Sequence, residues 1–232
     1  MDMIIDALTN LSVEDFDAIR LTLRLAGVTT LILLVLATPL SWWLARTSSR
    51  WKSLIASLVM LPVVMPPAVL GFYLLVFWGH QGLGGRLTNW LGWGELPFTF
   101  AGLVVGSVIY SLPFAVQPLH AAFAQVSSRS LEVAATLGAG PFDRFVSVIL
   151  PQSRRGLLNA ILLAFTHTVG EFGVVMLLGG NIPGQTEVMS MRIYEHVEAM
   201  EYGRAHWLAA MLLLFSFVVL LVLHFFQDRR DR

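Results

Sequence analysis

The stretch Glu132-Val-Ala-Ala-Thr-Leu-Gly138, with Leu150-Pro151 after it, is the polar segment that decides how this chain is interpreted. Glycine suits the left-handed position that ends a helix, and proline interrupts a helix. We therefore predict two short helices with a turn at Gly138. Ala134 and Ala135 leave little side-chain bulk on the first helix, so another surface can approach it closely. A segment of this kind either is held by a partner or folds back on its own protein.

The ends of these two helices are also predicted from local chemistry. Ser128 or Ser130 is expected to cap the first helix, with Glu132 in its first turn near the positive end of the helix dipole. Pro141 is placed to begin the second helix, and Pro151 to end it.

The rest of the 232-residue chain is strongly apolar, with 56% hydrophobic residues, 13% charged residues and a mean hydropathy of +0.71. Several apolar runs reach the ~20 residues that cross a bilayer core, and they do not alternate as barrel strands do. The predicted fold class is all-α: one domain, residues 1–232, forming a polytopic transmembrane bundle of about five spans. The expected spans are 22–45, 54–78, 98–118, 157–179 and 205–227, and the polar loop is residues 119–156.

Basic residues predict the orientation of this bundle. Ten of the fifteen Lys and Arg fall on one side of the expected spans, which the positive-inside rule assigns to the cytoplasm. The acidic N-terminus, Met1 to Ile19, is then periplasmic and the C-terminus cytoplasmic. The N-terminus lacks the basic region of a signal peptide, so we expect it to remain on the mature protein. The ten residues are Arg46, Arg50, Lys52, Arg129, Arg144, Arg154, Arg155, Arg229, Arg230 and Arg232.

The two expected outer loops differ in character. Residues 79–97 are rich in glycine and contain Trp90 and Trp93, which is typical of a turn-rich connection anchored at the membrane interface. Residues 180–203 place Met191, Tyr194 and Val197 on one face of a possible helix. We predict a short amphipathic helix at the outer membrane surface.

Prolines interrupt the second expected span, in Leu61-Pro-Val-Val-Met-Pro-Pro-Ala-Val-Leu-Gly71. Pro62, Pro66 and Pro67 remove backbone donors and clash with the preceding turn. Carbonyls freed at bilayer depth must face protein or a water-filled path. A broken helix beside a pore is one interpretation, and a packing kink is the other.

The fourth expected span contains Gly170-Glu-Phe-Gly173. Glu171 is the acid placed inside the bilayer, where a carboxylate is costly and needs a partner or a proton. His167 lies four residues earlier on the same helical face, so we hypothesise a His167–Glu171 pair. The pair has a gating role, or it only supports the structure. Ser107, Ser111, Thr166 and Thr168 are candidate pore-lining donors, with interhelical hydrogen bonding as the alternative.

Together these motifs resemble the molybdate permease family of ABC transporters over about residues 20–225. The polar loop is similar to the EAA loop of ABC importer permeases, with Val133 in place of the first alanine and Val148 in place of isoleucine. The proline motif, the Gly170–Gly173 motif and Gly180-Asn-Ile-Pro-Gly-Gln-Thr186 followed by Ile193-Tyr194 carry the rest of the resemblance. The Gly170–Gly173 motif is shared with sulfate and thiosulfate permeases, and tungstate permeases are close relatives.

The resemblance implies a MetI-like fold and a transporter rather than an enzyme. It implies alternating access in the bacterial inner membrane, with a second copy of the chain, two ATP-binding cassette subunits and a periplasmic binding protein as partners. Coupling to the ATP-binding subunit would fall to Glu132, Ala134, Ala135, Gly138, Leu150 and Pro151. The translocation gate would include Pro62, Pro66, Pro67, Ser111, Thr166, His167, Gly170 and Glu171.

The chain itself lacks the motor. A phosphate-binding loop needs glycines before a lysine, and Lys52 is the only lysine, preceded by Trp51. We therefore expect no cofactor on this chain and assign ATP and Mg²⁺ to a partner subunit; we expect no nucleic-acid partner. The absence of cysteine excludes disulfides and thiol chemistry, and a zinc site at His167 and Glu171 would lack a third ligand.

Three rival functions remain open from the sequence. A sulfate, thiosulfate or tungstate permease would differ in the oxyanion that it carries. A membrane-embedded enzyme would use His167 and Glu171 as an acid–base pair and act without partners. A passive channel would conduct without ATP and would not need the polar loop.

Overall fold

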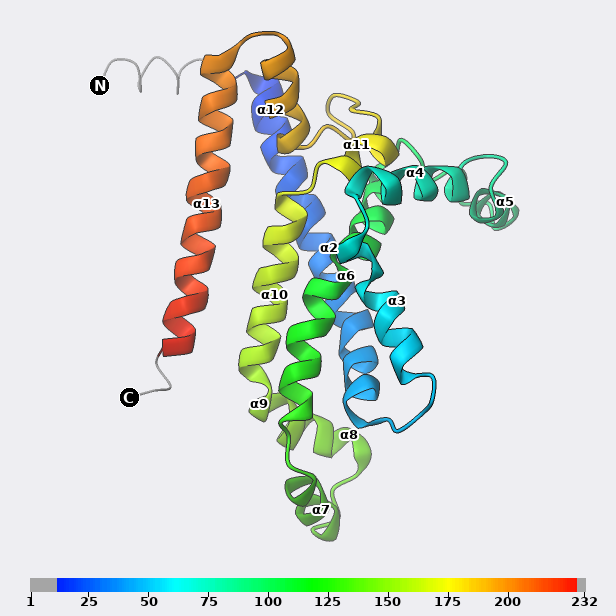
Figure 1. Ribbon diagram of the computed structural model, residues 1–232, viewed down its shortest axis with the longest axis vertical. Coiled ribbons are helices and arrows are strands. Elements are labelled where there is room, and N and C mark those ends of the chain that lie inside the picture. Colours follow the sequence, from blue (N-terminus) through cyan, green and yellow to red (C-terminus); the bar gives the residue numbers. More distant parts are fainter. Residues whose placement is uncertain (1–11, 229–232) are drawn as a thin grey trace.

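The computed structural model describes residues 12–228, and every regular element in that range is a helix (Figure 1). Three helices are long and apolar enough to cross a bilayer alone: α2 (Val13–Arg46), α6 (Phe100–Ala124) and α13 (Tyr202–Asp228), the last over Tyr202–Val222. Two bent pairs supply further crossings if each is taken as one span. They are α3 (Lys52–Val64) with α4 (Pro67–Trp78), and α10 (Arg154–Val169) with α11 (Gly173–Gly179).

The remaining helices are short. They are α5 (Leu83–Trp90), α7 (Ser128–Thr136), α8 (Pro141–Arg144), the π-helix η1 (Phe145–Ile149), α9 (Leu150–Gln152) and α12 (Met189–Glu198). Helices α7 to α9 project from the lower end of the bundle in Figure 1, near the connection between α2 and α3. Helix α12 and the first turn of α2 lie at the opposite end. Arg229, Arg230, Arg232 and residues 1–11 lie outside the described residues.

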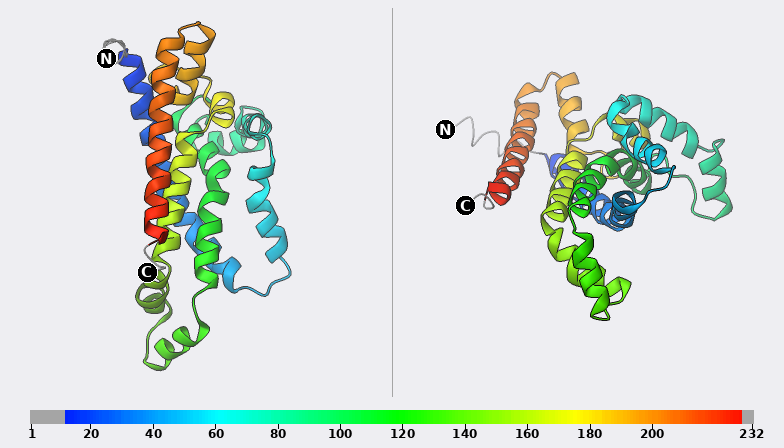
Figure 2. Two further views of the ribbon diagram at one scale, coloured as in Figure 1. Left: turned by 60° about the vertical axis from the view of Figure 1, so that its left-hand side comes forward. Right: turned by 60° about the horizontal axis from the view of Figure 1, so that its bottom comes forward.

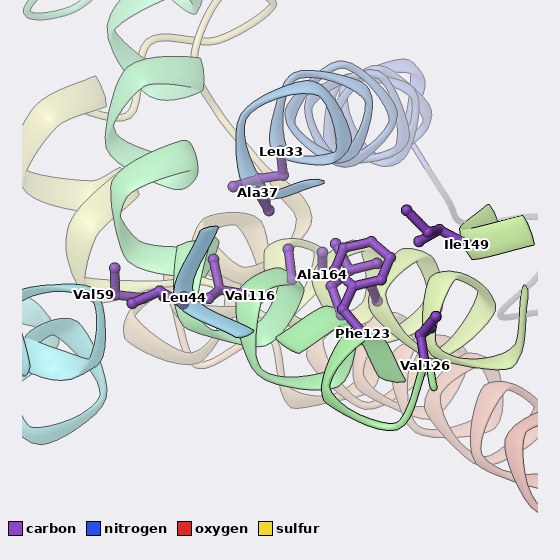
Figure 3. Close-up of a cluster of buried hydrophobic side chains, with 12 residues drawn as sticks. Leu33, Ala37, Leu44, Val59, Val116, Phe123, Val126, Ile149 and Ala164 are labelled. Carbon is purple, nitrogen blue, oxygen red and sulfur yellow. The ribbon is translucent and has the colours of Figure 1, made fainter. Parts of the chain in front are cut away.

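Helices α2, α6 and α10 form the packed centre of the bundle (Figure 3). Their buried faces combine small residues such as Ala37, Ala115 and Ala164 with larger ones such as Leu33 and Phe123. Small residues let helix backbones approach closely, which is how helices gain packing energy in a membrane. A Cβ atom built on Gly156 of α10 would lie 2.3 Å from the Cβ of Ala122 on α6.

Two span boundaries differ from the prediction. Helix α2 begins at Val13 rather than near residue 22, because Ser12 and Asp15 form a capping box that starts the helix early. Helix α6 continues to Ala124, past the predicted end at residue 118, with Pro113 and Pro118 inside it. Close packing of α6 against α2 and α10 maintains this helix through both prolines.

The second span is broken, as predicted, but its geometry is more extreme than a kink. The chain turns by 113° between α3 and α4. Pro62 lies inside α3, so it does not cause the break; Pro66 and Pro67 do, as the cap and first residue of α4. Thirteen residues of α3 rise only about 20 Å. Helices α4 and α5 then extend sideways from the bundle (Figures 1 and 2).

The break in the fourth span lies against the break in the second. Helices α10 and α11 are bent by 59° at residues 170–172. Gly173 at the start of α11 touches the start of α4, where an added Cβ would lie 2.9 Å from the Cβ of Pro67. A Cβ built on Gly71 of α4 would lie 3.1 Å from the Cα of Val174 on α11. Glycine is needed at both positions because two helix backbones meet there.

Candidate functional site

The turn of the polar loop has the predicted geometry. Gly138 has a φ of +86°. The N–H of Ala139 donates to the carbonyl of Ala134 over 3.0 Å, and the N–H of Gly138 donates to that of Ala135 over 3.0 Å. These two bonds form a complete Schellman motif, which satisfies carbonyls at the end of α7.

Both sides of this turn line one open groove of about 550 Å³. Ala134 comes from α7 and Pro151 from α9, so the structure brings these two predicted coupling residues together. Leu137 and Phe142 at the tip are exposed to 83% and 81%. Glu132 and Ala135 are exposed outside the groove lining, and Leu150 is partly buried behind it. The polar loop therefore presents apolar surface with nothing from residues 12–228 covering it.

Three local predictions about the polar loop were wrong. Ser127 is the N-cap of α7, with no side-chain capping bond, and Glu132 is not in the first turn. Pro151 lies within α9 and does not end the helix; the break comes at Ser153, just before α10. The π-helix η1 precedes Pro151, and its wider turn accommodates a proline ring and missing donor that an α-helical turn would not.

Arg46 at the end of α2 holds the base of the polar loop. Its Nη2 donates to the carbonyl of Val126, and its Nη1 donates to the hydroxyl of Ser128 over 3.1 Å. The guanidinium also lies 4.9 Å from the ring centroid of Trp42. The hydrogen bonds from Arg46 fix the chain at Val126 and Ser128, and they explain why α7 is capped at Ser127 rather than at Ser128 or Ser130. The sequence places Arg46 near the loop only as one of several cytoplasmic bases.

A second feature is a cavity of about 620 Å³ beside the two helix breaks, which we name the break cavity. Its lining combines residues from α4, α6, α10 and α11 and the linker between the last two. It includes Pro67, Thr166, His167, Gly170 and Glu171 from the predicted gate, with Ala68, Tyr110, Phe172, Gly173, Met176 and Leu177. Pro62, Pro66 and Ser111 of the predicted gate do not line it.

Glu171 has two hydroxyl partners from α6. Ser107 Oγ donates to Oε2 and Ser111 Oγ donates to Oε1, each over 2.6 Å, and all three side chains are buried. Ser107 and Ser111 are four residues apart and therefore share one helical face. His167 Nδ1 lies 3.6 Å from Oε1, so the hypothesised pair is close but is bridged by Ser111, whose Oγ lies 2.9 Å from Nδ1.

Of the four hydroxyl residues proposed to line a pore, only one lines the break cavity. Ser107 and Ser111 make interhelical hydrogen bonds, which is the alternative interpretation rather than the pore-lining one. Thr168 also contacts Ser111, over 2.9 Å. Thr166 lines the break cavity and donates to the carbonyl of Leu162 on its own helix.

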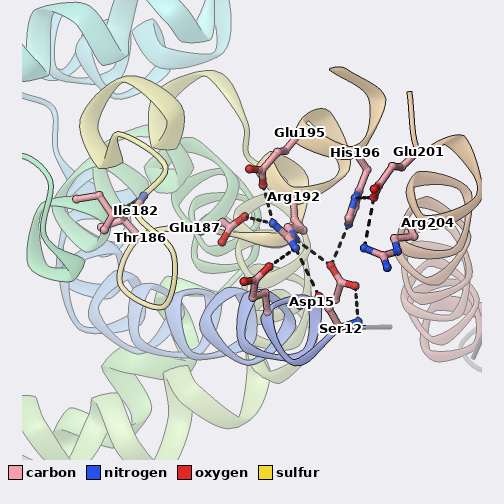
Figure 4. Close-up of polar contacts among 11 residues, drawn as sticks. Ser12, Asp15, Ile182, Thr186, Glu187, Arg192, Glu195, His196, Glu201 and Arg204 are labelled. Atoms are coloured by element: carbon pink, nitrogen blue, oxygen red, sulfur yellow. Dashed lines mark hydrogen bonds and ion pairs between the residues drawn. The ribbon is translucent and has the colours of Figure 1, made fainter. Parts of the chain in front are cut away.

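A third polar cluster lies at the end of the bundle opposite the polar loop (Figure 4). Arg192 of α12 is buried and contacts Asp15 over 2.9 Å, Glu187 over 3.2 Å and Glu195 over 2.7 Å. A fourth carboxylate, that of Glu14, lies 2.6 Å from Arg192. We name this set the outer clasp, because it ties the start of α2 to α12.

Helix α12 forms within the segment predicted to hold a short helix, and its apolar residues differ in exposure. Met191 is buried, Tyr194 and Val197 are exposed, and Arg192 and His196 face inward. His196 contacts Asp15 and Glu201, each over 3.0 Å. Several acids near Arg192 in the sequence hinted at ion pairing. No local pattern identifies Asp15, which is 177 residues away.

Crowding of carboxylates in the outer clasp changes their acidity. Burial, reinforced by a hydrogen bond with Glu195, raises the pKa of Glu187 from 4.5 to about 7, against the opposing charge of Arg192. Burial alone would raise the pKa of Glu195, but its bonds with Glu187 and Arg192 lower it. Glu187 is therefore the carboxyl of this pair that gains a proton first as the pH falls.

Solved structures identify the class of fold. A bacterial ABC transporter that imports the acidic polysaccharide alginate matches all of this chain and 84% of its own, with a TM-score of 0.74 at 17% identity. The same kind of transporter in complex with an alginate-bound periplasmic protein matches 94% of this chain and 80% of its own, with a TM-score of 0.74 at 19% identity. The helices thus adopt the fold of an ABC importer permease.

Sequence relatives narrow the class to a family. A sequence model of the binding-protein-dependent transport system inner membrane component matches residues 37–232. The molybdenum transport system permease of Azotobacter vinelandii is 59% identical over 92% of this chain and 95% of its own. That of Haemophilus influenzae is 32% identical over 90% of both chains. A sulfate transport system permease of Synechocystis is 30% identical over 96% of this chain and 76% of its own.

The chain therefore belongs to the binding-protein-dependent transport system inner membrane components, within the group of molybdenum transport system permeases. It is a multi-pass protein of the inner membrane and a transport permease rather than an enzyme.

Proposed function

We propose that this chain imports molybdate as the permease subunit of an ATP-driven transporter. The observation that carries the proposal is the presence of two features in one chain. The polar loop exposes a groove of mixed polar and apolar lining at one end of the bundle, and the break cavity lies beside the breaks in the second and fourth spans. A permease driven by a separate motor needs both a docking surface and a path. The relationship to molybdenum permeases supplies the substrate.

The proposed partners are assigned from the groove of the polar loop and from the family to which the chain belongs. An ATP-binding subunit would occupy the groove between α7 and α9, with Ala134 and Pro151 in contact and Gly138 holding the turn. A second copy of the chain would complete the path, two ATP-binding subunits would hydrolyse ATP with Mg²⁺, and a periplasmic protein would deliver the anion. The polar loop would then be cytoplasmic, and the outer clasp periplasmic.

The mechanism we propose is alternating access. Closure of the ATP-binding subunits would move the polar loop, and Arg46 would pass that movement to α2 because it bonds to Val126 and Ser128. The breaks in the second and fourth spans would rearrange at the break cavity. ATP drives the change because it binds the two states with different affinity.

A sulfate permease is the second candidate function, because a sulfate transport system permease of Synechocystis is 30% identical to this chain. The 59% identity to a molybdenum permease favours molybdate. A tungstate permease would differ from a molybdate permease in one result: tungstate would compete with labelled molybdate better than unlabelled molybdate does.

The test is uptake of radiolabelled molybdate by cells that lack their own system and express this chain with its partner subunits. Excess sulfate or tungstate serves as competitor. Gly138→Val and Gly140→Val form a matched pair. Both glycines have open space around them, but only Gly138 requires a positive φ.

We expect uptake that resists sulfate, that falls about tenfold or more in Gly138→Val, and that changes little in Gly140→Val, because valine in a left-handed conformation costs on the order of 1–2 kcal/mol and distorts the turn. Suppression by sulfate would assign the chain to sulfate. Equal uptake by both variants would contradict the docking role of the turn.

A further inference from the structure

The lining of the break cavity has an unbalanced charge for a path that carries an anion. Its lining includes Glu171, whose carboxyl is buried directly behind the cavity wall, and, from the described residues, neither lysine nor arginine. An anion entering beside an ionised carboxylate is repelled, and the repulsion is strong where the dielectric constant is low. His167 is the one lining residue that can carry positive charge.

The His167 ring is held in a fixed orientation. It stacks on Phe114 with centroids 3.8 Å apart and an interplanar angle of 24°. Tyr110 lies against it with centroids 4.7 Å apart. The Nδ1 atom is engaged by Ser111 over 2.9 Å. The Nε2 atom has no hydrogen-bond partner among residues 12–228 and is not sealed from solvent, so it is the polar atom that His167 offers to the cavity.

Proton bookkeeping assigns the role of Nδ1. A serine hydroxyl has one proton to donate, and Ser111 donates it to Glu171 Oε1 over 2.6 Å. Ser111 therefore accepts from His167, and Nδ1 carries a hydrogen. In the neutral ring Nε2 is then a lone pair, which repels an anion. In the protonated ring Nε2–H is a donor, and the positive charge lies within 3.6 Å of the Glu171 carboxylate that compensates it.

We propose that protonated His167 is the group in the break cavity that binds the transported oxyanion, through a hydrogen bond from Nε2. Ser111 and Glu171 are positioning residues for the ring. A tetrahedral dianion offers acceptor oxygens only, so it is bound by the imidazolium and excluded by the neutral tautomer. This inference rests on the proposed function, since it assigns a binding group within the same path.

The other titratable groups that face the ring do not reproduce this switch. They are Glu171 from the linker after α10, and Tyr110 from α6. The cavity residues from α4 and α11 are Pro67, Ala68, Gly173, Met176 and Leu177, none of which titrates. A dependence of transport on pH that disappears with the imidazole is therefore specific to His167.

The experiment is molybdate transport by the complete complex in proteoliposomes, with apparent KM and kcat measured at about pH 6 and about pH 8, on either side of the usual titration of histidine. The variants are His167→Gln and His167→Arg. His206→Gln is the matched control, because His206 lies on α13 away from the cavity. ATP hydrolysis stimulated by the binding protein reports on folding and assembly.

We expect the wild type and His206→Gln to have the same kcat/KM at each pH. In both, kcat/KM should be about tenfold higher at about pH 6 than at about pH 8. In His167→Gln we expect kcat/KM to be low and independent of pH. In His167→Arg we expect it to be independent of pH because the charge is permanent. A His167→Gln complex that hydrolyses ATP normally and keeps the wild-type pH profile would overturn the proposal.

A second measurement applies if the variants do not assemble. The wild-type complex with ¹⁵N-labelled histidine is titrated with molybdate, and the ring signals are observed by NMR. We expect one Nε2 signal to move on addition of anion, and no movement of any ring signal would overturn the proposal. Wild-type uptake of sulfate alone would change the proposed substrate, with sulfate replacing molybdate in both tests. Absence of any oxyanion uptake by the wild type would instead refute the proposed function.

Discussion

At the scale of single residues, Glu187 shows how burial sets protonation. Its pKa of about 7 lies above the ordinary value of 4.5, so between these values the folded chain holds a proton that the unfolded chain has lost. The stability from this group is fully present below about pH 4.5 and is lost as the pH rises through about 7. The charged groups facing it are Arg192 and Glu195.

We therefore expect Glu187→Gln to raise the stability of the detergent-solubilised protein at pH 8 by about 1–3 kcal/mol and to change it little at pH 5. The measurement is the thermal unfolding midpoint at both pH values. Glu198→Gln is the control, since Glu198 is exposed on the same helix. Only the difference between the two variants is interpreted, because it separates the carboxyl of Glu187 from the other charged groups of the outer clasp. An equal shift in both variants at pH 8 would refute the assignment.

What could be predicted of single residues depended on how local their role is. The positive φ of Gly138 follows from one helix end, and it was predicted correctly. The burial of Arg192 depends on Asp15, at the far end of the chain, and was missed. The contact between His167 and Glu171 was predicted only in part. Helical spacing placed them together, but the intervening Ser111 comes from another helix.

At the scale of helices, close contact between α6 and α10 requires a missing side chain at Gly156. An added Cβ would also lie 2.9 Å from the carbonyl oxygen of Pro118. Gly156→Ala should therefore force the helices apart and cost about 1–3 kcal/mol. Gly27→Ala in α2 meets nothing within 4 Å and should instead stabilise by about 0.5–1 kcal/mol, because alanine favours the helix.

The measurement is the denaturation midpoint of both alanine variants in mild detergent. Similar midpoints for the two would mean that α6 and α10 do not pack as closely as described. Such packing also explains why only some of the prolines interrupt a helix. Pro118 lies in a helix held on two sides by α2 and α10 and does not end it, whereas Pro66 lies at the edge of the bundle and begins a new helix.

At the scale of the whole molecule, the two ends of the bundle should lie on opposite sides of the membrane. The chain has no cysteine, so single cysteines can report on sidedness without a background signal. Phe142 on the polar loop and Trp90 on α5 are each exposed to 81%. We expect a membrane-impermeant maleimide to label Trp90→Cys in spheroplasts and Phe142→Cys only after lysis. Labelling of both before lysis would refute the proposed topology.

The overall architecture was predictable because hydropathy marks the apolar runs and prolines mark the break in the second span. The five apolar runs correspond to three continuous helices and two bent pairs. The 113° turn after α3 was not predictable, because it depends on α11 lying beside α4 and on the glycines that allow this contact.

The outer clasp also constrains the order in which the protein is made. Arg192 is synthesised 177 residues after Asp15. At ordinary translation speeds of about 5–20 residues per second, Asp15 waits about 10–35 s for its partner. An unpaired carboxylate is too costly to bury during that time. The first turn of α2 therefore stays hydrated until α12 has emerged, so a segment that is made early is among the last to be locked in place.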